Sequence, residues 1–155
     1  MSSLGVKLQH VLPHHLISRV VLGFTRVRWR PLKNLITSLF VRGFKPDMSD
    51  AVEPDPLAYG SFNEFFTRAL RPGARPLAAG DTTLASPVDG TVSQLGHMAD
   101  DRLLQAKGRF YTLEALLSGA APKWAPEFHK GSFATIYLAP YNYHRIHMPT
   151  DGTLR

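Results

Sequence analysis

The distribution of charge along the chain limits the possible folds more than any other feature. Residues 1–46 carry eight lysine and arginine side chains and no aspartate or glutamate. All twelve acidic residues of the 155-residue chain come after this segment, together with ten basic ones. A stretch with one sign of charge cannot neutralise itself, so it favours a polyanionic partner, either nucleic acid or an anionic lipid surface.

The same basic segment has the apolar spacing of amphipathic helices. The stripes fall in residues 4–12, 16–24 and 32–40. Pro31 suits the first turn of the third helix, and Gly43 suits the position just past its end. No stripe reaches the about 20 apolar residues that a membrane-spanning helix needs. Basic helices of this kind suit a membrane interface, and packing against the rest of the protein explains the stripes equally well.

The rest of the chain differs in composition and period. Residues 46–60 are rich in proline and acidic side chains and are predicted to be a linker. Ser61 and Glu64 form a capping box, which predicts a short helix reaching Leu70. Alternating side chains predict later strands. We expect an α+β protein in which basic amphipathic N-terminal helices precede a strand-rich domain, with boundaries at residues 1–45, 46–60 and 61–155.

Two short segments carry residues suited to proton transfer. Asp89 precedes Gly90 just before a predicted strand at residues 91–95, although Asp-Gly is also common in turns. His144 and His147 follow a second predicted strand, and histidine is the side chain that titrates nearest neutral pH. A structural histidine pair explains the same pattern. Because no third ligand is fixed nearby, we expect no metal site. The absence of cysteine excludes disulfides and thiolate nucleophiles.

Four motifs together resemble the bacterial-type phosphatidylserine decarboxylases. They occur in the family's order, and the similarity runs along essentially the whole chain. The motifs are Phe62-Asn63-Glu64-Phe65-Phe66-Thr67-Arg68, Ser86-Pro87-Val88-Asp89-Gly90, Lys107-Gly108 with Tyr111-Thr112-Leu113-Glu114-Ala115-Leu116-Leu117, and Tyr143-His144-Arg145-Ile146-His147-Met148-Pro149.

This resemblance implies a proenzyme that makes its own cofactor. In the family, the serine of a Leu-Gly-Ser-Thr motif attacks the preceding glycine carbonyl to form an ester. Elimination of this ester, followed by hydrolysis with loss of ammonia, leaves a covalent pyruvoyl group, which is the electron sink for decarboxylation. Matched by motif, Asp89 corresponds to the relay carboxylate and His147 to the general base. His144 corresponds to a histidine that assists decarboxylation. The implied reaction converts phosphatidylserine to phosphatidylethanolamine and carbon dioxide.

The chain departs from the family at the pyruvoyl-forming serine. No Leu-Gly-Ser-Thr occurs in residues 1–155, and the Gly-Ser pairs at Gly60-Ser61 and Gly131-Ser132 have other neighbours. We therefore expect the N-terminal portion of a proenzyme, with an incomplete catalytic domain, no pyruvoyl site of its own and no activity alone. The alternative is a truncated lipid-binding protein without catalysis.

The resemblance also implies partners and a location. We expect the phospholipid substrate, an anionic membrane surface and the C-terminal part (alpha chain) of the same proenzyme as partners, and leave a homodimer open. Nucleic acid is not expected, because no reading module is recognisable. A peripheral position on the cytoplasmic face of the inner membrane follows. A biotinyl or lipoyl carrier domain is disfavoured, since neither Lys107 nor Lys123 has the hydrophobic hairpin setting that the modified lysine needs.

Overall fold

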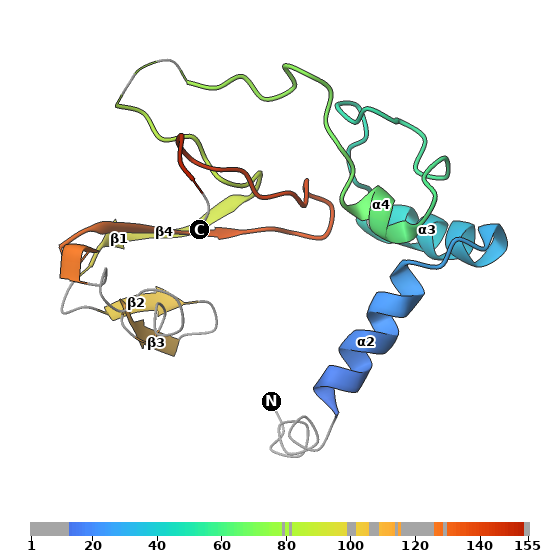
Figure 1. Cartoon of the computed structure of the whole chain (residues 1–155), viewed down its shortest axis with the longest axis horizontal. Helices are drawn as coiled ribbons and strands as arrows, with labels where there is room; N and C mark the ends of the chain where they lie inside the picture. The colour runs from blue at the N-terminus through green and yellow to red at the C-terminus, as the bar shows by residue number, and fades with distance from the viewer. Residues whose placement is uncertain are drawn as a thin grey trace. The chain divides into compact units, whose positions relative to one another are not determined.

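The computed structural model describes residues 13–78, 80, 82–98, 102–105, 109–113, 115, 126–128 and 130–153. By its internal contacts the chain divides into two units, Met1–Asp81 and Thr82–Arg155. The described part of the first unit is helical, and that of the second holds two antiparallel two-stranded sheets (Figure 1). The predicted mixed α+β class is therefore confirmed.

Two helices follow the apolar stripes of the basic segment. Helix α2 (His14–Thr25) covers the second predicted stripe and α3 (Arg30–Phe44) covers the third, whereas residues 4–12 lie outside the described part of the chain. The predicted end at Gly43 is wrong, because the helix includes Gly43 and Phe44. Lys45 ends it instead, in the left-handed conformation with φ of 48°. Among the described residues, none of the helices has the length and apolar character needed to cross a membrane.

Aromatic rings form the core between α3 and the short helix α4 (Phe62–Phe66). Phe65 is fully buried. The ring of Phe40 on α3 meets the rings of three α4 residues edge to face, with centroids 5.1 to 5.9 Å apart, namely Phe62, Phe65 and Phe66. Phe44 also packs on Phe40, at 4.7 Å between centroids, which explains why α3 continues past Gly43.

Hydrogen bonds from a buried lysine of α3, Lys33, hold the segment before α4 against this helix. Lys33 is only 4% exposed. Its Nζ donates to the carbonyl oxygens of Leu57 at 2.6 Å and Tyr59 at 2.8 Å. The ammonium group therefore satisfies two backbone acceptors that lie more than twenty residues further along the chain.

The cap of α4 matches the prediction in part. Ser61 Oγ accepts a hydrogen bond from the Glu64 amide at 3.1 Å, as a capping box requires. The Glu64 carboxylate accepts from the Gly60 amide, at 3.1 Å, and pairs with the exposed side chain of Arg28. The predicted extension to Leu70 is wrong. The helix ends at Phe66, and Leu70 instead forms an antiparallel bridge with a residue of the preceding segment, Ala51.

In the second unit, β1 (Thr91–His97) pairs antiparallel with β4 (Ser132–Tyr137), and β2 (Arg102–Gln105) pairs with β3 (Arg109–Thr112). The β1–β4 register runs from Thr91 opposite Tyr137 to His97 opposite Ser132, with an irregularity between Val92 and Gln94. Large apolar side chains of this ribbon are exposed, namely Val92, Leu95 and Tyr137. A two-stranded ribbon has too little partner surface to bury them.

Candidate active site

The two segments singled out for proton transfer lie side by side in the second unit. Asp89 forms an antiparallel bridge with Tyr143. The amide of His147 donates to the carbonyl of Pro87 at 2.8 Å. Further along, the Ala85 amide donates to the Pro149 carbonyl at 2.9 Å. Backbone hydrogen bonds thus hold the segment that carries Asp89 against the segment that carries the two histidines.

The β1–β4 ribbon leads directly into this pair of segments. Gly90 separates Asp89 from the first residue of β1 and lies against the end of β4. A Cβ at Gly90 would lie 2.6 Å from the carbonyl oxygen of Tyr137, closer than side-chain carbons approach backbone. The missing side chain therefore lets the Asp89 segment approach β4. Gly90 is therefore needed for the close approach of this segment to β4, in addition to the turn chemistry expected from the sequence.

The imidazole of His147 is held by a neighbouring phenol. Tyr143 Oη and His147 Nε2 are 2.9 Å apart. Their rings stack at an interplanar angle of 21°, with centroids 5.5 Å apart. Tyr143 is 7% exposed, while His147 is exposed. Within the described parts of the chain, no hydrogen bond reaches the other imidazole nitrogen, Nδ1. One side of the ring is therefore anchored and the other is accessible.

His144 has a different environment from His147. Its Nε2 lies 2.9 Å from the carbonyl oxygen of Ala139, and its side chain is half-buried. Because a carbonyl only accepts, Nε2 of His144 carries a proton. The turn that supplies this carbonyl is fixed by Asn142, whose side-chain oxygen accepts from the Ala139 amide at 2.7 Å.

The structure therefore brings Asp89, His144 and His147 into one pair of segments, with Asp89 half-buried. No role was predicted for Tyr143, although this phenol lies four residues before His147 inside the same motif. As for metals, the described residues contain no group of three or more histidine, aspartate or glutamate side chains placed to bind an ion.

Two family models match the amino-acid sequence of this chain. The family model for phosphatidylserine decarboxylase matches residues 62–155, and a second model, described as PSD, matches residues 4–45. The chain belongs to the phosphatidylserine decarboxylase family. This membership does not favour the alternative of a lipid-binding protein without catalysis.

Individual relatives agree with the family assignment. The chain is 53% identical over 147 residues to the phosphatidylserine decarboxylase proenzyme of Bordetella avium. The matched region covers 95% of this chain and 50% of that protein. It is 51% identical over 155 residues to the proenzyme of Alkalilimnicola ehrlichii, covering 100% of this chain and 54% of that protein. The chain spans about half the length of the curated relatives it matches.

Proposed function

We propose that this chain is the N-terminal part of a pyruvoyl-dependent phosphatidylserine decarboxylase proenzyme. In this proposal Asp89 and His147 form the relay for self-cleavage, and His144 assists decarboxylation. The supporting observation is the backbone pairing of residues 85–89 with residues 143–149. An acid–base relay needs its carboxylate and imidazole on neighbouring, fixed backbone, and this pairing provides such a frame.

The proposed chemistry of His147 is proton transfer with a serine from elsewhere in the proenzyme. The exposed imidazole takes the proton of the serine hydroxyl as the hydroxyl oxygen attacks the preceding glycine carbonyl. The negative charge of Asp89 stabilises the imidazolium that forms. Once formed, the pyruvoyl group supplies the electron sink for release of carbon dioxide from phosphatidylserine.

In this proposal the nucleophilic serine lies outside residues 1–155, because no Leu-Gly-Ser-Thr occurs in them. We assign residues 1–45 to membrane association, 46–60 to a linker and 61–155 to part of the catalytic domain. The C-terminal part of the same proenzyme is then the partner that supplies the serine. The exposed apolar side chains of the β1–β4 ribbon support a partner surface there. Residues 1–155 alone should not release carbon dioxide.

A chimeric proenzyme tests this proposal. Residues 1–155 are joined to the remaining half of the Bordetella avium relative, which is 53% identical over the matched region. Cleavage into two chains and carbon dioxide release from phosphatidylserine are measured, with the intact relative as the control for folding. We expect both activities in the chimera and neither in its His147→Ala variant. Unchanged cleavage of His147→Ala would contradict the relay role of His147. Carbon dioxide release by residues 1–155 alone would contradict the placement of the nucleophile outside these residues.

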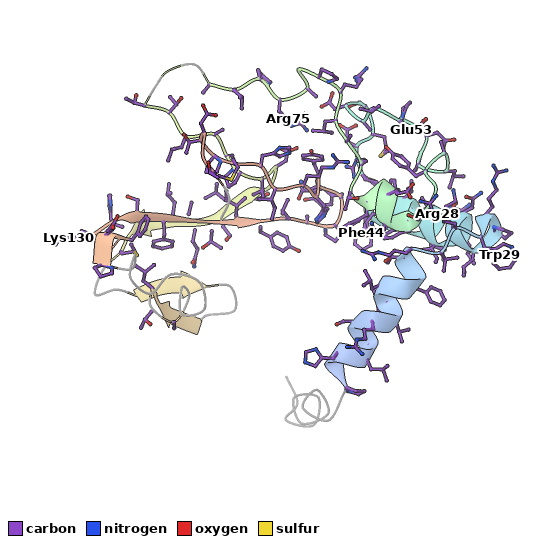
Figure 2. All side chains as sticks on the ribbon, in the orientation of Figure 1. Arg28, Trp29, Phe44, Glu53, Arg75 and Lys130 are labelled. Atoms are coloured by element: carbon purple, nitrogen blue, oxygen red, sulfur yellow. The ribbon has the colours of Figure 1, made fainter. Side chains whose placement is uncertain are left out.

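We also propose that the helices of the first unit bind anionic lipid peripherally, on the cytoplasmic face of the inner membrane. The apolar side chains of α2 are exposed, namely Leu16, Ile17, Val20, Val21, Leu22 and Phe24. Trp29, labelled in Figure 2, is 67% exposed just before α3. Apolar side chains of this kind enter the acyl boundary, while each nearby arginine or lysine gains about 1 kcal/mol from an anionic surface.

Flotation with vesicles separates the contribution of the basic side chains to lipid binding from that of the apolar side chains. We expect the proenzyme chimera to float better with vesicles that contain phosphatidylglycerol than with purely zwitterionic vesicles. Replacing Arg19 and Arg26 by glutamine should weaken this preference, whereas replacing Val20 and Phe24 by serine should weaken binding to both kinds of vesicle. Equal flotation of the unsubstituted protein with both would show that charge makes no contribution.

A further inference from the structure

We propose that Tyr143 is a positioning residue that holds the imidazole of His147 for proton transfer. The inference rests on the proposed role of His147 and deepens it. It stands on the hydroxyl contact at 2.9 Å, on the stacking of the two rings and on the burial of Tyr143. The buried phenol is fixed by its surroundings, so it can fix the exposed imidazole in turn.

Backbone contacts leave the side-chain rotamer of His147 for Tyr143 to control. The backbone of Tyr143 is fixed by its bridge to Asp89, and that of His147 by its bond to the Pro87 carbonyl. What remains free at His147 is rotation about its side-chain bonds. An exposed imidazole without a partner would sample several rotamers. The hydroxyl bond and the stacked ring select one of them.

The contact also selects the nitrogen that takes the proton. Nε2 faces the phenol, while Nδ1 makes no hydrogen bond within the described residues. For Nδ1 to accept the serine proton, the neutral ring must carry its own hydrogen on Nε2 and donate it to the Tyr143 oxygen. The same bond persists in the imidazolium, whose charge strengthens it. Asp89 then acts on the imidazolium through its charge. Other ionisable side chains of the paired segments are those of His144 and Arg145.

Tyr143→Phe keeps the ring and removes only the accepting oxygen. Without that acceptor, the imidazolium that forms as the serine proton is taken loses one of its hydrogen bonds. The pH of half-maximal self-cleavage should fall by about half to one pH unit. The rate on the high-pH plateau should also fall, by roughly three- to tenfold, because the ring is no longer held. Tyr143→Ala, which also removes the stacking, should cleave more slowly still.

The experiment uses the chimeric proenzyme made by cell-free synthesis, which provides a time zero for self-cleavage. Rates are measured between about pH 5 and 9 for the parent protein, Tyr143→Phe and Tyr143→Ala. Tyr141→Phe is the matched control, because it removes a hydroxyl from the same turn and should leave both rate and midpoint unchanged. Replacement of Tyr143 by 3-fluorotyrosine provides a second test that preserves shape. Its weaker acceptor oxygen should move the half-maximal pH in the same direction as Tyr143→Phe does, by a smaller amount.

The outcomes separate this inference from the proposed function. If His147→Ala cleaves at the parent rate, the proposed relay itself fails. If His147→Ala is uncleaved but Tyr143→Phe keeps the parent midpoint and rate, Tyr143 serves packing alone and only the positioning inference fails. Faster cleavage by Tyr143→Phe on the high-pH plateau would also overturn it, because the hydroxyl would then compete with the serine for the ring.

Discussion

The amide of His147 donates to the carbonyl oxygen of Pro87 at 2.8 Å. This bond is made by backbone atoms alone, so the backbone position of His147 does not depend on a side chain in the opposite segment. Since the bridge between Asp89 and Tyr143 lies two residues from Pro87, the same frame positions the carboxylate. Substitutions that disturb the backbone should therefore affect the site more than substitutions that change neighbouring side chains.

Replacing Gly90 by alanine should separate the Asp89 segment from β4. The added Cβ would lie 2.6 Å from the Tyr137 carbonyl oxygen, and the backbone must shift to accommodate it. We expect a loss of about 1 to 3 kcal/mol in unfolding free energy, measured by urea denaturation, and slower self-cleavage in the chimera. Gly96→Ala is the control, because its Cβ would meet only the Phe133 ring at 3.4 Å. Equal effects of both substitutions would show that the close approach at Gly90 is unimportant.

Replacing Lys33 by methionine should destabilise the first unit. The substitution preserves most of the side-chain volume but leaves the Leu57 and Tyr59 carbonyls without their donor. Unpaired buried acceptors cost about 1 to 3 kcal/mol each, an upper range here because some water can reach the loop. Loss of helical circular dichroism in urea measures the change. The matched control is Arg42→Met, an exposed position on the same helix. A stable Lys33→Met protein would show that the ammonium bonds contribute little.

The two halves of the α4 cap should differ in strength. Ser61→Ala removes the acceptor for the Glu64 amide and should cost about 1 kcal/mol. Glu64→Gln instead weakens an ion pair whose partner, the Arg28 side chain, is 74% exposed, so its effect should be smaller and should vanish in high salt. Thermal denaturation at low and high salt compares them. A salt-dependent loss in Ser61→Ala would contradict this assignment.

Asp47 should make an acid-sensitive contribution to the folding stability of the first unit. The Ser49 amide, which donates to Asp47 at 2.8 Å, is the main cause that lowers the pKa of this carboxyl below 3.8, and the Ser49 side chain, Arg68 and Arg75 act in the same direction. A lowered pKa means that the folded chain favours the carboxylate, so the stabilisation is present above pH 3.8 and is lost as the pH falls through the folded value.

Asp47→Asn isolates that effect. The variant should be less stable than the parent at neutral pH, and the difference should shrink as the pH falls below about 3.8. Urea midpoints measured across this range provide the test. A difference that stays constant down to pH 3 would mean that the charge of Asp47 has no part in it.

The helices α2 and α3 could be predicted because the spacing of apolar side chains is a local property of the sequence. Their boundaries could not, since distant contacts set them. Phe44 extends α3 by packing on Phe40. Leu70 pairs with Ala51 and does not extend α4. Lys33 is one of the eight basic residues in residues 1–46, and its burial could not be predicted, because lysine is rarely buried. Its two carbonyl partners lie in the segment predicted to be a linker, which no local pattern connects to α3.

For the candidate site, residue type and motif resemblance selected Asp89, His144 and His147. The contact between Tyr143 and His147 could not be derived from spacing. An interval of four residues brings side chains together on a helix, whereas residues 144–148 are neither helix nor strand. The register that sets Asp89 opposite Tyr143 is likewise a property of long-range pairing, which the sequence does not encode locally.

The β1–β4 ribbon has a consequence for how the protein can vary. Thr91 and Tyr137 pair at the end next to the acid–base segments, whereas His97 and Ser132 pair at the other end, about 20 Å away for a strand of this length. The chain between His97 and Ser132 therefore departs from the ribbon at the end remote from Asp89. A substitution in the His97–Ser132 pair should therefore disturb the relay less than one in the Thr91–Tyr137 pair.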